Sequence, residues 1–241
     1  MRRISVEDER VRGIVLENGQ CIAAPVVISN ADVRQTALEL VGRDHLPAGY
    51  LRQLRRLQPS ISAFIAYLAV ERSTLSPASH ETFFFETTDH EAAYESALAG
   101  TPRWFTATVP THVDPSLAPE DEHLLVLTTL LGADAGPWPE RKQELTDALV
   151  DAAAARIPGL RDSLRFCEGA SPRTMERYTR NESGAIYGFA LTPAQVGPSR
   201  PAPTTPLRGL YLAGHWTQPG GGITGVITSG QHCARAILDA T

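Results

Sequence analysis

The segment that most constrains the fold lies in the last part of the sequence, where a glycine-rich loop separates two apolar runs. Residues 210–213 predict a short strand and residues 223–238 predict a helix. Between them stand Gly214 and a glycine triplet at residues 220–222. Glycine lets the backbone approach a ligand closely and adopt a positive φ. A helix that begins after such a loop presents unpaired N–H groups and the positive end of its dipole, which suits an anionic or electron-rich group.

Residues 220–225 also match the G-x-G-x-x-G pattern that binds a dinucleotide pyrophosphate. We reject that interpretation, because the pattern needs a second strand and an acidic residue about twenty positions further on. Here the sequence runs only to Thr241. A plain glycine turn before a helix, with no ligand, has the same spacing. The spacing alone therefore leaves a ligand-facing loop and a plain turn open.

The rest of the sequence alternates between strand and helix patterns. Asn18-Gly19 predicts a tight hairpin turn after a β-rich run, and Asp32 is a good N-cap for a helix through about Val41. Pro47 predicts the start of a second helix. The remaining expected elements are strands at 25–29, 62–70, 82–86, 104–109, 124–131 and 160–167, helices at 90–99 and 140–156, and a proline-rich extended linker at 193–206. Within the strand at 82–86, the run Phe83-Phe84-Phe85 indicates core packing, with a lipid- or substrate-facing role as the alternative. This order predicts a mixed or antiparallel sheet with flanking helices.

Composition excludes several classes of protein. The net charge of −5, with acids and bases interspersed, gives no basic face for nucleic acid. Three cysteines without metal spacing favour a reduced, cytoplasmic setting. The apolar runs are too short to span a bilayer, although peripheral membrane contact stays open. His215 and His232 have no third ligand at a sensible spacing, so we predict no metal site.

Residues 210–226 resemble the C-terminal motif of phytoene-desaturase-like flavoproteins, which include carotenoid desaturases and isomerases of the flavin amine oxidase-type superfamily. That motif is a strand Leu-Tyr-(Leu/Phe)-(Ala/Val)-Gly, a Thr-x-Pro-Gly turn, a glycine pair, and Gly-Val opening a helix. Residues 11–19 with 26–32 are similar to the family's hairpin and its Ser-Asn-Ala-Asp strand end. Residues 176–188 are similar to the segment before the last strand in the isomerase branch. Together these matches span nearly the whole chain.

The resemblance implies an α/β (α+β) fold with two parts. A partial FAD-binding Rossmann-type domain would comprise residues 1–45 and 205–241, and a mixed or antiparallel sheet with helices at 46–204 would form the substrate domain. FAD is the implied cofactor, with hydride exchange between flavin N5 and an apolar, polyene or isoprenoid-like substrate. The resemblance names no catalytic residue.

The resemblance also implies positions for the cofactor. Gly214 and His215 would lie along the ribityl–pyrophosphate chain, and Gly222, Ile223 and Val226 would lie near the pyrimidine edge of the flavin. A helix N-terminus there would stabilise the negative charge of a reduced flavin. Gly221 and Thr224 complete the predicted cofactor-binding set. Three further residues are candidates for lining the substrate cavity, although ordinary packing explains the tyrosines equally well: Tyr178, Arg180 and Tyr187.

Two departures from the family pattern matter. His215 stands where many relatives carry an acid. The family's N-terminal glycine-rich loop is missing, and residues 1–4 would align with a mid-domain segment, so we expect an open sheet edge and weak or no FAD binding by this chain alone. We therefore expect a partner chain carrying the N-terminal half, or self-association, to complete the site. The alternatives are a truncated remnant, a non-catalytic interaction subunit, and a non-redox enzyme that uses the apolar cavity.

Overall fold

A computed structural model describes residues 1–75, 79–134, 137–138 and 140–240. The chain divides into two compact units. The first unit comprises residues 1–60 and 179–241, and the second comprises residues 61–178. Each unit has its own buried core.

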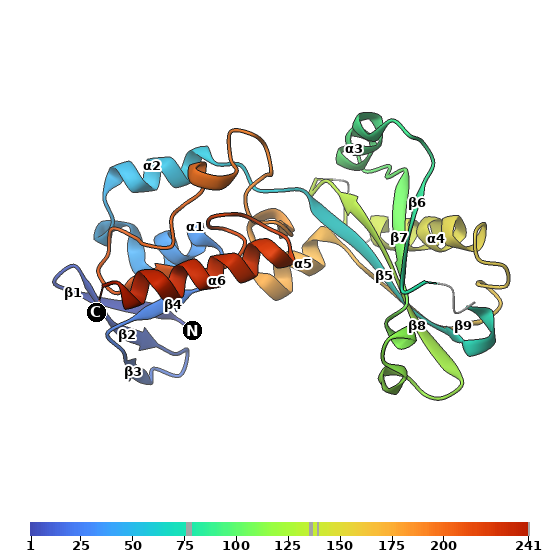
Figure 1. Ribbon diagram of the computed structural model, residues 1–241, viewed down its shortest axis with the longest axis horizontal. Helices are drawn as coiled ribbons and strands as arrows, with labels where there is room; N and C mark the ends of the chain where they lie inside the picture. Colours follow the sequence, from blue (N-terminus) through green and yellow to red (C-terminus); the bar gives the residue numbers. More distant parts are fainter. Residues whose placement is uncertain (76–78, 135–136, 139, 241) are drawn as a thin grey trace. The chain divides into compact units, whose positions relative to one another are not determined.

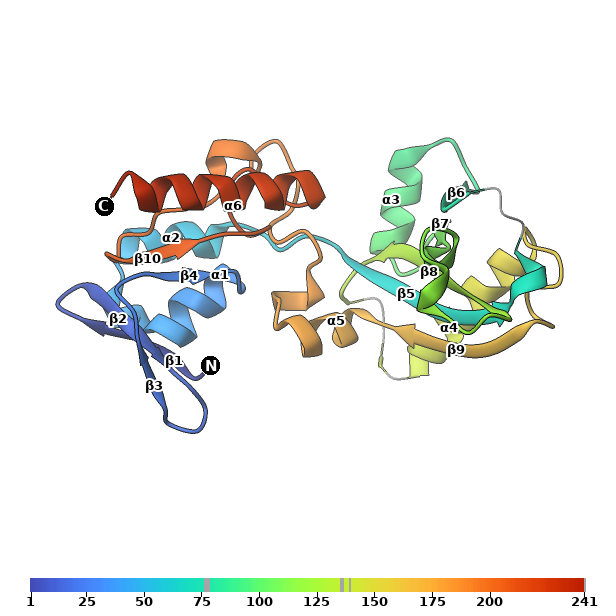
Figure 2. The same cartoon turned by 60° about the horizontal axis from the view of Figure 1, so that its bottom comes forward.

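Two small sheets form the framework of the first unit (Figures 1 and 2). One sheet is antiparallel and consists of β1 (Arg3–Glu7), β2 (Arg10–Val15) and β3 (Cys21–Ala23). Gly19 adopts the positive φ of 86° that the β2–β3 turn requires, which confirms the predicted hairpin. The other sheet is a parallel pair of β4 (Val27–Ser29) and β10 (Leu210–Leu212). This pair joins the beginning of the chain to the strand that precedes the glycine loop.

The helices of the first unit follow local signals in the sequence. Asp32 caps α1 (Val33–Gln35) by accepting hydrogen bonds from the backbone N–H groups of Arg34 and Gln35. The same run continues as the π-helix η1 (Thr36–Gly42), followed by η2 (Arg43–His45) and α2 (Ala48–Arg56), with Pro47 as the N-cap of α2. The last helix is α6 (Ile223–Leu238), which lies beside β10 (Figure 2). The remaining short elements are η6 (Glu182–Gly184) and η7 (Gly197–Ser199).

The second unit is built on one five-stranded antiparallel sheet with the order β6-β7-β8-β5-β9. The central strands β5 (Ser62–Glu71) and β8 (Glu122–Leu131) pair over ten residues, from Ser62↔Leu131 to Glu71↔Glu122. In β8, half-buried and buried residues alternate strictly, because successive side chains point to opposite faces. The other strands are β6 (Glu81–Phe85), β7 (Trp104–Thr108) and β9 (Leu164–Ala170).

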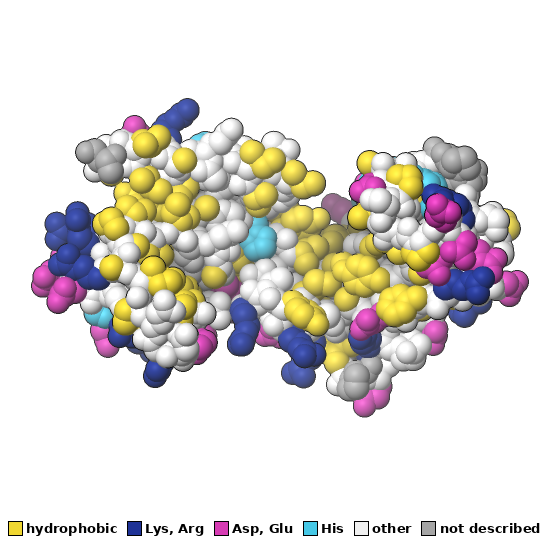
Figure 3. All heavy atoms as spheres, turned by 90° about the horizontal axis from the view of Figure 1, so that it is seen from below, with side chains coloured by type: hydrophobic (Ala, Val, Ile, Leu, Met, Phe, Trp, Pro, Cys, Tyr) yellow, Lys and Arg dark blue, Asp and Glu magenta, His cyan; other side chains and the backbone are white. Residues whose placement is uncertain are grey.

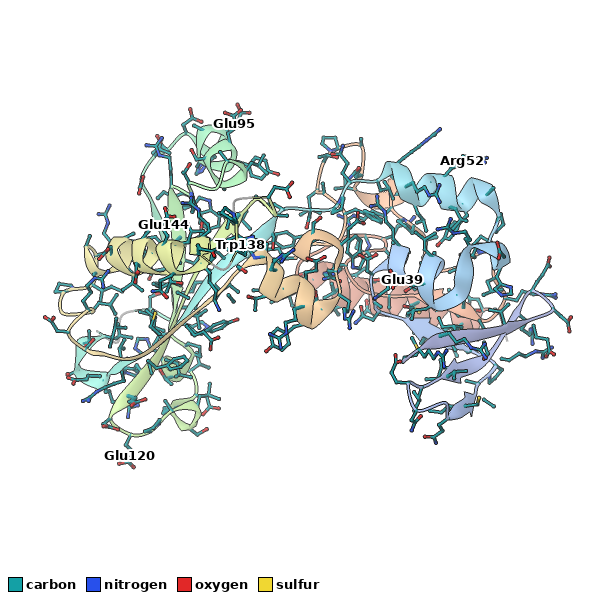
Figure 4. All side chains as sticks on the ribbon, turned by 180° about the vertical axis from the view of Figure 1, so that it is seen from behind. Glu39, Arg52, Glu95, Glu120, Trp138 and Glu144 are labelled. Carbon is teal, nitrogen blue, oxygen red and sulfur yellow. The ribbon has the colours of Figure 1, made fainter. Side chains whose placement is uncertain are left out.

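One face of this sheet packs on α4 (Glu140–Ala154) to form the second core. Leu125, Leu127 and Leu131 of β8 are fully buried there. Trp138, beside the start of α4, stacks on Phe64 of β5 with 6.4 Å between the ring centroids, and Glu144 lies on α4 (Figure 4). The remaining elements are η3 (Arg72–Thr74), α3 (His90–Leu98), η4 (Pro110–His112), η5 (Pro115–Leu117) and α5 (Pro172–Thr179).

The structure confirms the predicted α/β class, with helices, a parallel strand pair and antiparallel sheets. Some local predictions need correction. The strand expected at 160–167 forms instead at Leu164–Ala170, because residues 155–163 make turns that end α4 and cover its core. Strand β1 and helix α5 were not predicted from the sequence. Both are short and rich in polar residues, so tertiary packing determines them.

The observed units also differ from the expected division at residues 45 and 205. Residues 46–60 and 179–204 pack with the first unit, since Leu54, Leu57 and Phe189 belong to its core. Within the described residues, the structure contains no helix with the length and apolarity that crossing a membrane requires.

Candidate functional site at the start of α6

The strand pair β4–β10 fixes the position of Gly214, the first residue of the glycine loop. Ala213 N–H donates to Ser29 O at 3.0 Å, so the pairing continues to the residue before the glycine. Gly214 has a φ of 96°, and a Cβ added there would lie 2.0 Å from Asn30 Oδ1. Glycine is favoured here, because other residues rarely adopt this φ and the Asn30 side chain would have to move.

Helix α6 is tied to the same point by a buried serine. Gly214 N–H donates to Ser229 Oγ at 3.0 Å, and Ser229 Oγ lies 3.2 Å from Thr217 Oγ1. Ser229 is fully buried. These bonds fix the second turn of α6 against the end of β10, and thereby fix where the helix begins.

The N-terminus of α6 has no cap from a side chain. Gly222 is the N-cap residue, and no acidic residue lies in the first turn. Val226 N–H donates to Gly222 O at 3.0 Å, so the three preceding N–H groups lie outside the helical ladder. Nothing lies within 4 Å of the position that a Cβ on Gly222 would take, whereas a Cβ on Gly221 would lie 2.9 Å from Tyr187 Cβ. The approach to the helix start is therefore open at Gly222.

The predicted cofactor residues gather at this helix start. Ile223 is 81% exposed and Thr224 is exposed, while Val226 is half-buried. The set that the sequence predicted as cofactor-binding thus shares one loop and one helical turn: Gly214, His215, Gly221, Gly222, Ile223, Thr224 and Val226. An anionic or electron-rich group fits here, because unpaired N–H groups and the positive dipole end converge on an open position.

The His215 side chain contacts a buried polar group. Its Nε2 accepts a hydrogen bond from Asn181 Nδ2 at 3.4 Å, and Asn181 Oδ1 accepts from Trp216 Nε1 at 3.1 Å. Burial lowers the pKa of His215 from 6.5, the nearby charge of Arg200 lowers it further, and a hydrogen bond to the backbone of Ile186 opposes both effects. His215 is therefore neutral at pH 7.

The three candidates for the substrate cavity lie in different surroundings. Tyr178, at the end of α5, is 77% exposed, and its ring lies 5.6 Å from the guanidinium carbon of Arg177. Arg180 is exposed and has a φ of 60°. Tyr187 is half-buried and packs on Gly221. Tyr187 therefore packs directly against the glycine loop.

Sequence reasoning missed Asn181, Ser229 and Arg200, which hold this site together. Arg200 is 1% exposed and donates to backbone carbonyls of His215 and Phe189. In the sequence it stands among prolines, where an arginine is typical of a solvated loop. Nothing in its spacing indicates burial.

The five-stranded sheet of the second unit leaves aromatic side chains exposed on the face opposite α4. Phe83 and Phe85 are 56% and 43% exposed, with stacked rings 6.4 Å apart, and Phe84 between them packs on the core. Phe84 thus packs on the core as predicted, whereas Phe83 and Phe85 are exposed. Tyr67 and Phe166 on the neighbouring strands β5 and β9 are also exposed. Apolar side chains gather on the face of this unit drawn at the right of Figure 3.

Among the residues the structure describes, no three or more His, Cys, Asp and Glu side chains are placed to hold a metal ion.

Comparison with known proteins assigns the chain to a family. The model of the family described as flavin containing amine oxidoreductase matches residues 1–238. The chain belongs to this family.

Curated relatives cover the chain almost completely. It is 27% identical to rat pyridine nucleotide-disulfide oxidoreductase domain-containing protein 2, over 98% of this chain and 45% of the relative. It is 28% identical to the chloroplastic prolycopene isomerase of Daucus carota, over 98% of this chain and 39% of the relative. It is 29% identical to the lycopene-forming phytoene desaturase of Pseudescherichia vulneris, over 99% of this chain and 50% of the relative. The chain spans about half the length of these relatives or somewhat less.

Among solved structures, an oxidoreductase from Methanosarcina mazei has the same fold. It matches 97% of this chain and 48% of its own chain, with a TM-score of 0.62 and 19% identity.

Proposed function

We propose that this chain provides the flavin-facing segment of an FAD-dependent oxidoreductase. The observation that carries the proposal is the open, uncapped N-terminus of α6 at Gly222, in a chain of a flavin-containing family. Gly222, Ile223, Thr224 and Val226 would hold the pyrimidine edge of the ring, and the backbone at Gly214 and His215 would follow the ribityl–pyrophosphate chain. FAD supplies hydride exchange when bound. The chain's own part is to position the ring and to offer N–H groups to the charge that develops on it.

For the substrate we propose an apolar, polyene or isoprenoid-like molecule. The carrot relative is named for isomerising prolycopene and the bacterial relative for desaturating phytoene. The open aromatic face of the second unit, with Phe83 and Phe85, is apolar enough to contact such a molecule. Tyr187, beside Gly221, is the candidate cavity residue that lies nearest the proposed flavin position.

We further propose that a second polypeptide completes the FAD site. It would be either a partner chain that carries the N-terminal half or a second copy of this chain. The support is apolar surface on the first unit. Ile223, Ile227 and Leu238 form an exposed stripe along α6, and Ile28 on β4 is 53% exposed. Surface of this kind is typical of an interaction face.

Purification from the native host, with any protein that copurifies, tests the proposed function. Visible absorption and protein-to-flavin stoichiometry are the measurements. We expect about one FAD per chain. Protein that remains flavin-free after incubation with FAD would contradict the proposal and favour a non-catalytic interaction subunit, whereas activity on an apolar substrate without flavin would favour a non-redox enzyme.

A further inference from the structure

A fully buried arginine lies directly behind the glycine loop. The guanidinium of Arg200 donates from Nη1 to His215 O at 2.6 Å and to Tyr187 O at 3.4 Å, and from Nη2 to Phe189 O. Gln218 Nε2 in turn donates to Arg200 O at 3.0 Å. Arg200 thus connects the segment around residue 188 to the loop that precedes α6.

The remaining nitrogen of this guanidinium is directed at the loop. Arg200 Nε is buried and has no hydrogen-bond partner. A Cβ on Gly220 would lie 3.2 Å from this nitrogen and 3.4 Å from the guanidinium carbon. Gly220 O itself contacts the first turn of α6, since a Cβ on Gly225 would lie 2.6 Å from it. The guanidinium and the helix start therefore lie on two sides of a single backbone segment.

The charge of Arg200 is not neutralised by a carboxylate within the described parts of the chain. It takes part in none of the salt bridges there, and burial alone lowers its pKa. An arginine stays protonated in a protein, so the site holds a buried positive charge. Buried charges are normally paired, because an unpaired one is expensive to desolvate. The backbone carbonyl groups accept hydrogen bonds from Nη1 and Nη2 but supply no net negative charge.

Two positive features thus converge on residues 220–222: the full charge of Arg200 and the dipole end of α6. On the basis of the proposed flavin site, we propose that Arg200 is a positioning residue that favours the reduced, anionic flavin ring over the oxidised, neutral ring. It acts across the backbone of the loop rather than by contact with the ring. In a buried setting such an interaction is screened far less than in water.

Two substitutions separate the charge from the hydrogen bonds. Arg200→Lys keeps the charge and loses the planar set of donors, whereas Arg200→Gln keeps an amide donor and loses the charge. Arg208→Gln is the matched control, because Arg208 is exposed in the same unit. Each protein is purified with the polypeptide that completes its flavin site. The flavin content, the free energy of unfolding and the two-electron reduction potential are measured.

We expect Arg200→Gln to shift the equilibrium between oxidised and reduced flavin at least tenfold toward the oxidised form, equivalent to about 30 mV for two electrons. Arg200→Lys should stay within about threefold of the wild type, and Arg208→Gln should match it. Retention of flavin by Arg200→Lys but not by Arg200→Gln would also support the proposal.

Equal flavin reduction potentials in the lysine and glutamine variants would overturn the electrostatic role. Loss of flavin from both variants would overturn it too, because Arg200 would then be a purely structural residue. If the wild type and Arg208→Gln both lack flavin, the proposed function itself fails and the role of Arg200 falls with it.

Discussion

The start of α6 and the sheet of the second unit are built on opposite principles. At the start of α6, backbone contacts and buried polar groups fix the chain: Gly214 fits against Asn30, and Ser229 receives the Gly214 N–H. In the second unit, strict alternation along β8 places leucines under α4 and leaves half-buried residues on the other face. The geometry of the first region is therefore sensitive to the addition of single atoms. The stability of the second region depends on the apolar volume packed on one face of its sheet.

This difference matches the different roles that we propose for the two units. Close backbone packing with unpaired N–H groups suits a charged, planar cofactor. An apolar sheet face with exposed aromatic rings suits an apolar substrate. The comparison predicts that core substitutions in the sheet reduce stability, that glycine substitutions in the loop disturb geometry, and that polar substitutions at the helix start change binding alone.

The largest effect on stability should come from the core of the sheet. Leu127 is fully buried under α4, so Leu127→Ala should cost about 2–5 kcal/mol of unfolding free energy through lost burial and a cavity. The matched variant is Phe83→Ala on the exposed face, for which we expect less than about 1.5 kcal/mol, since much of that ring already contacts water. The loss of unfolding free energy is measured by urea denaturation, with amide hydrogen exchange reporting on each unit separately. Equal losses would show that the open face is part of the core.

A smaller loss is expected from the loop glycine. Gly214→Ala introduces a methyl group 2.0 Å from Asn30 Oδ1 at a φ of 96°, so we expect a loss of about 2–3 kcal/mol from overlap and strain. Gly19→Ala is the control, because Gly19 has a φ of 86° with nothing within 4 Å, and it should cost about 1–2 kcal/mol.

Pairing Gly214→Ala with Asn30→Ala should recover part of the loss, since the overlapping oxygen is then removed. If the double variant recovers nothing, the Asn30 contact does not explain the glycine.

The smallest effect concerns pH. The folded chain holds the pKa of His215 below 6.5, so the unfolded state binds the proton first as the pH falls. Stability is therefore complete above pH 6.5 and decreases as the pH falls through 6.5 toward the lowered pKa. Denaturation at pH 7.5 and 5.5 should show a smaller decrease for His215→Gln than for the wild type. His232→Gln, on the exposed side of α6, should behave like the wild type.

His123 contributes to the same pH dependence in the second unit, because burial, followed by the nearby His112 and Arg72, lowers its pKa as well. The informative quantity is therefore the difference between His215→Gln and the wild type. An unchanged pH dependence in His215→Gln would contradict the neutral state assigned to this half-buried histidine.

The sequence predicted those features that local chemistry determines. The turn at Asn18-Gly19, the cap at Asp32 and the strand–loop–helix at residues 210–238 each depend on residues close together in the chain. Asn181 and Arg200 could not be predicted as site residues. Both form hydrogen bonds with His215, which lies 34 residues from Asn181 and 15 residues from Arg200 in the sequence. Burial of a polar side chain depends on tertiary contacts that no short spacing records. The π-helix at Thr36–Gly42 was not predicted either, since the sequence indicated only a helix that begins after Asp32.

The central claim is that the start of α6 faces an anionic flavin, and a pair of substitutions at Thr224 tests it most directly. Thr224 is exposed in the first turn, where an acidic side chain favours the helix dipole. Thr224→Asp and Thr224→Asn have nearly the same shape and differ by one charge. We predict that the aspartate variant unfolds no more easily than the asparagine variant. With the polypeptide that completes the flavin site present, it should nevertheless bind reduced FAD at least tenfold more weakly in an anaerobic titration. Equal affinity for reduced FAD in the two variants would contradict the account.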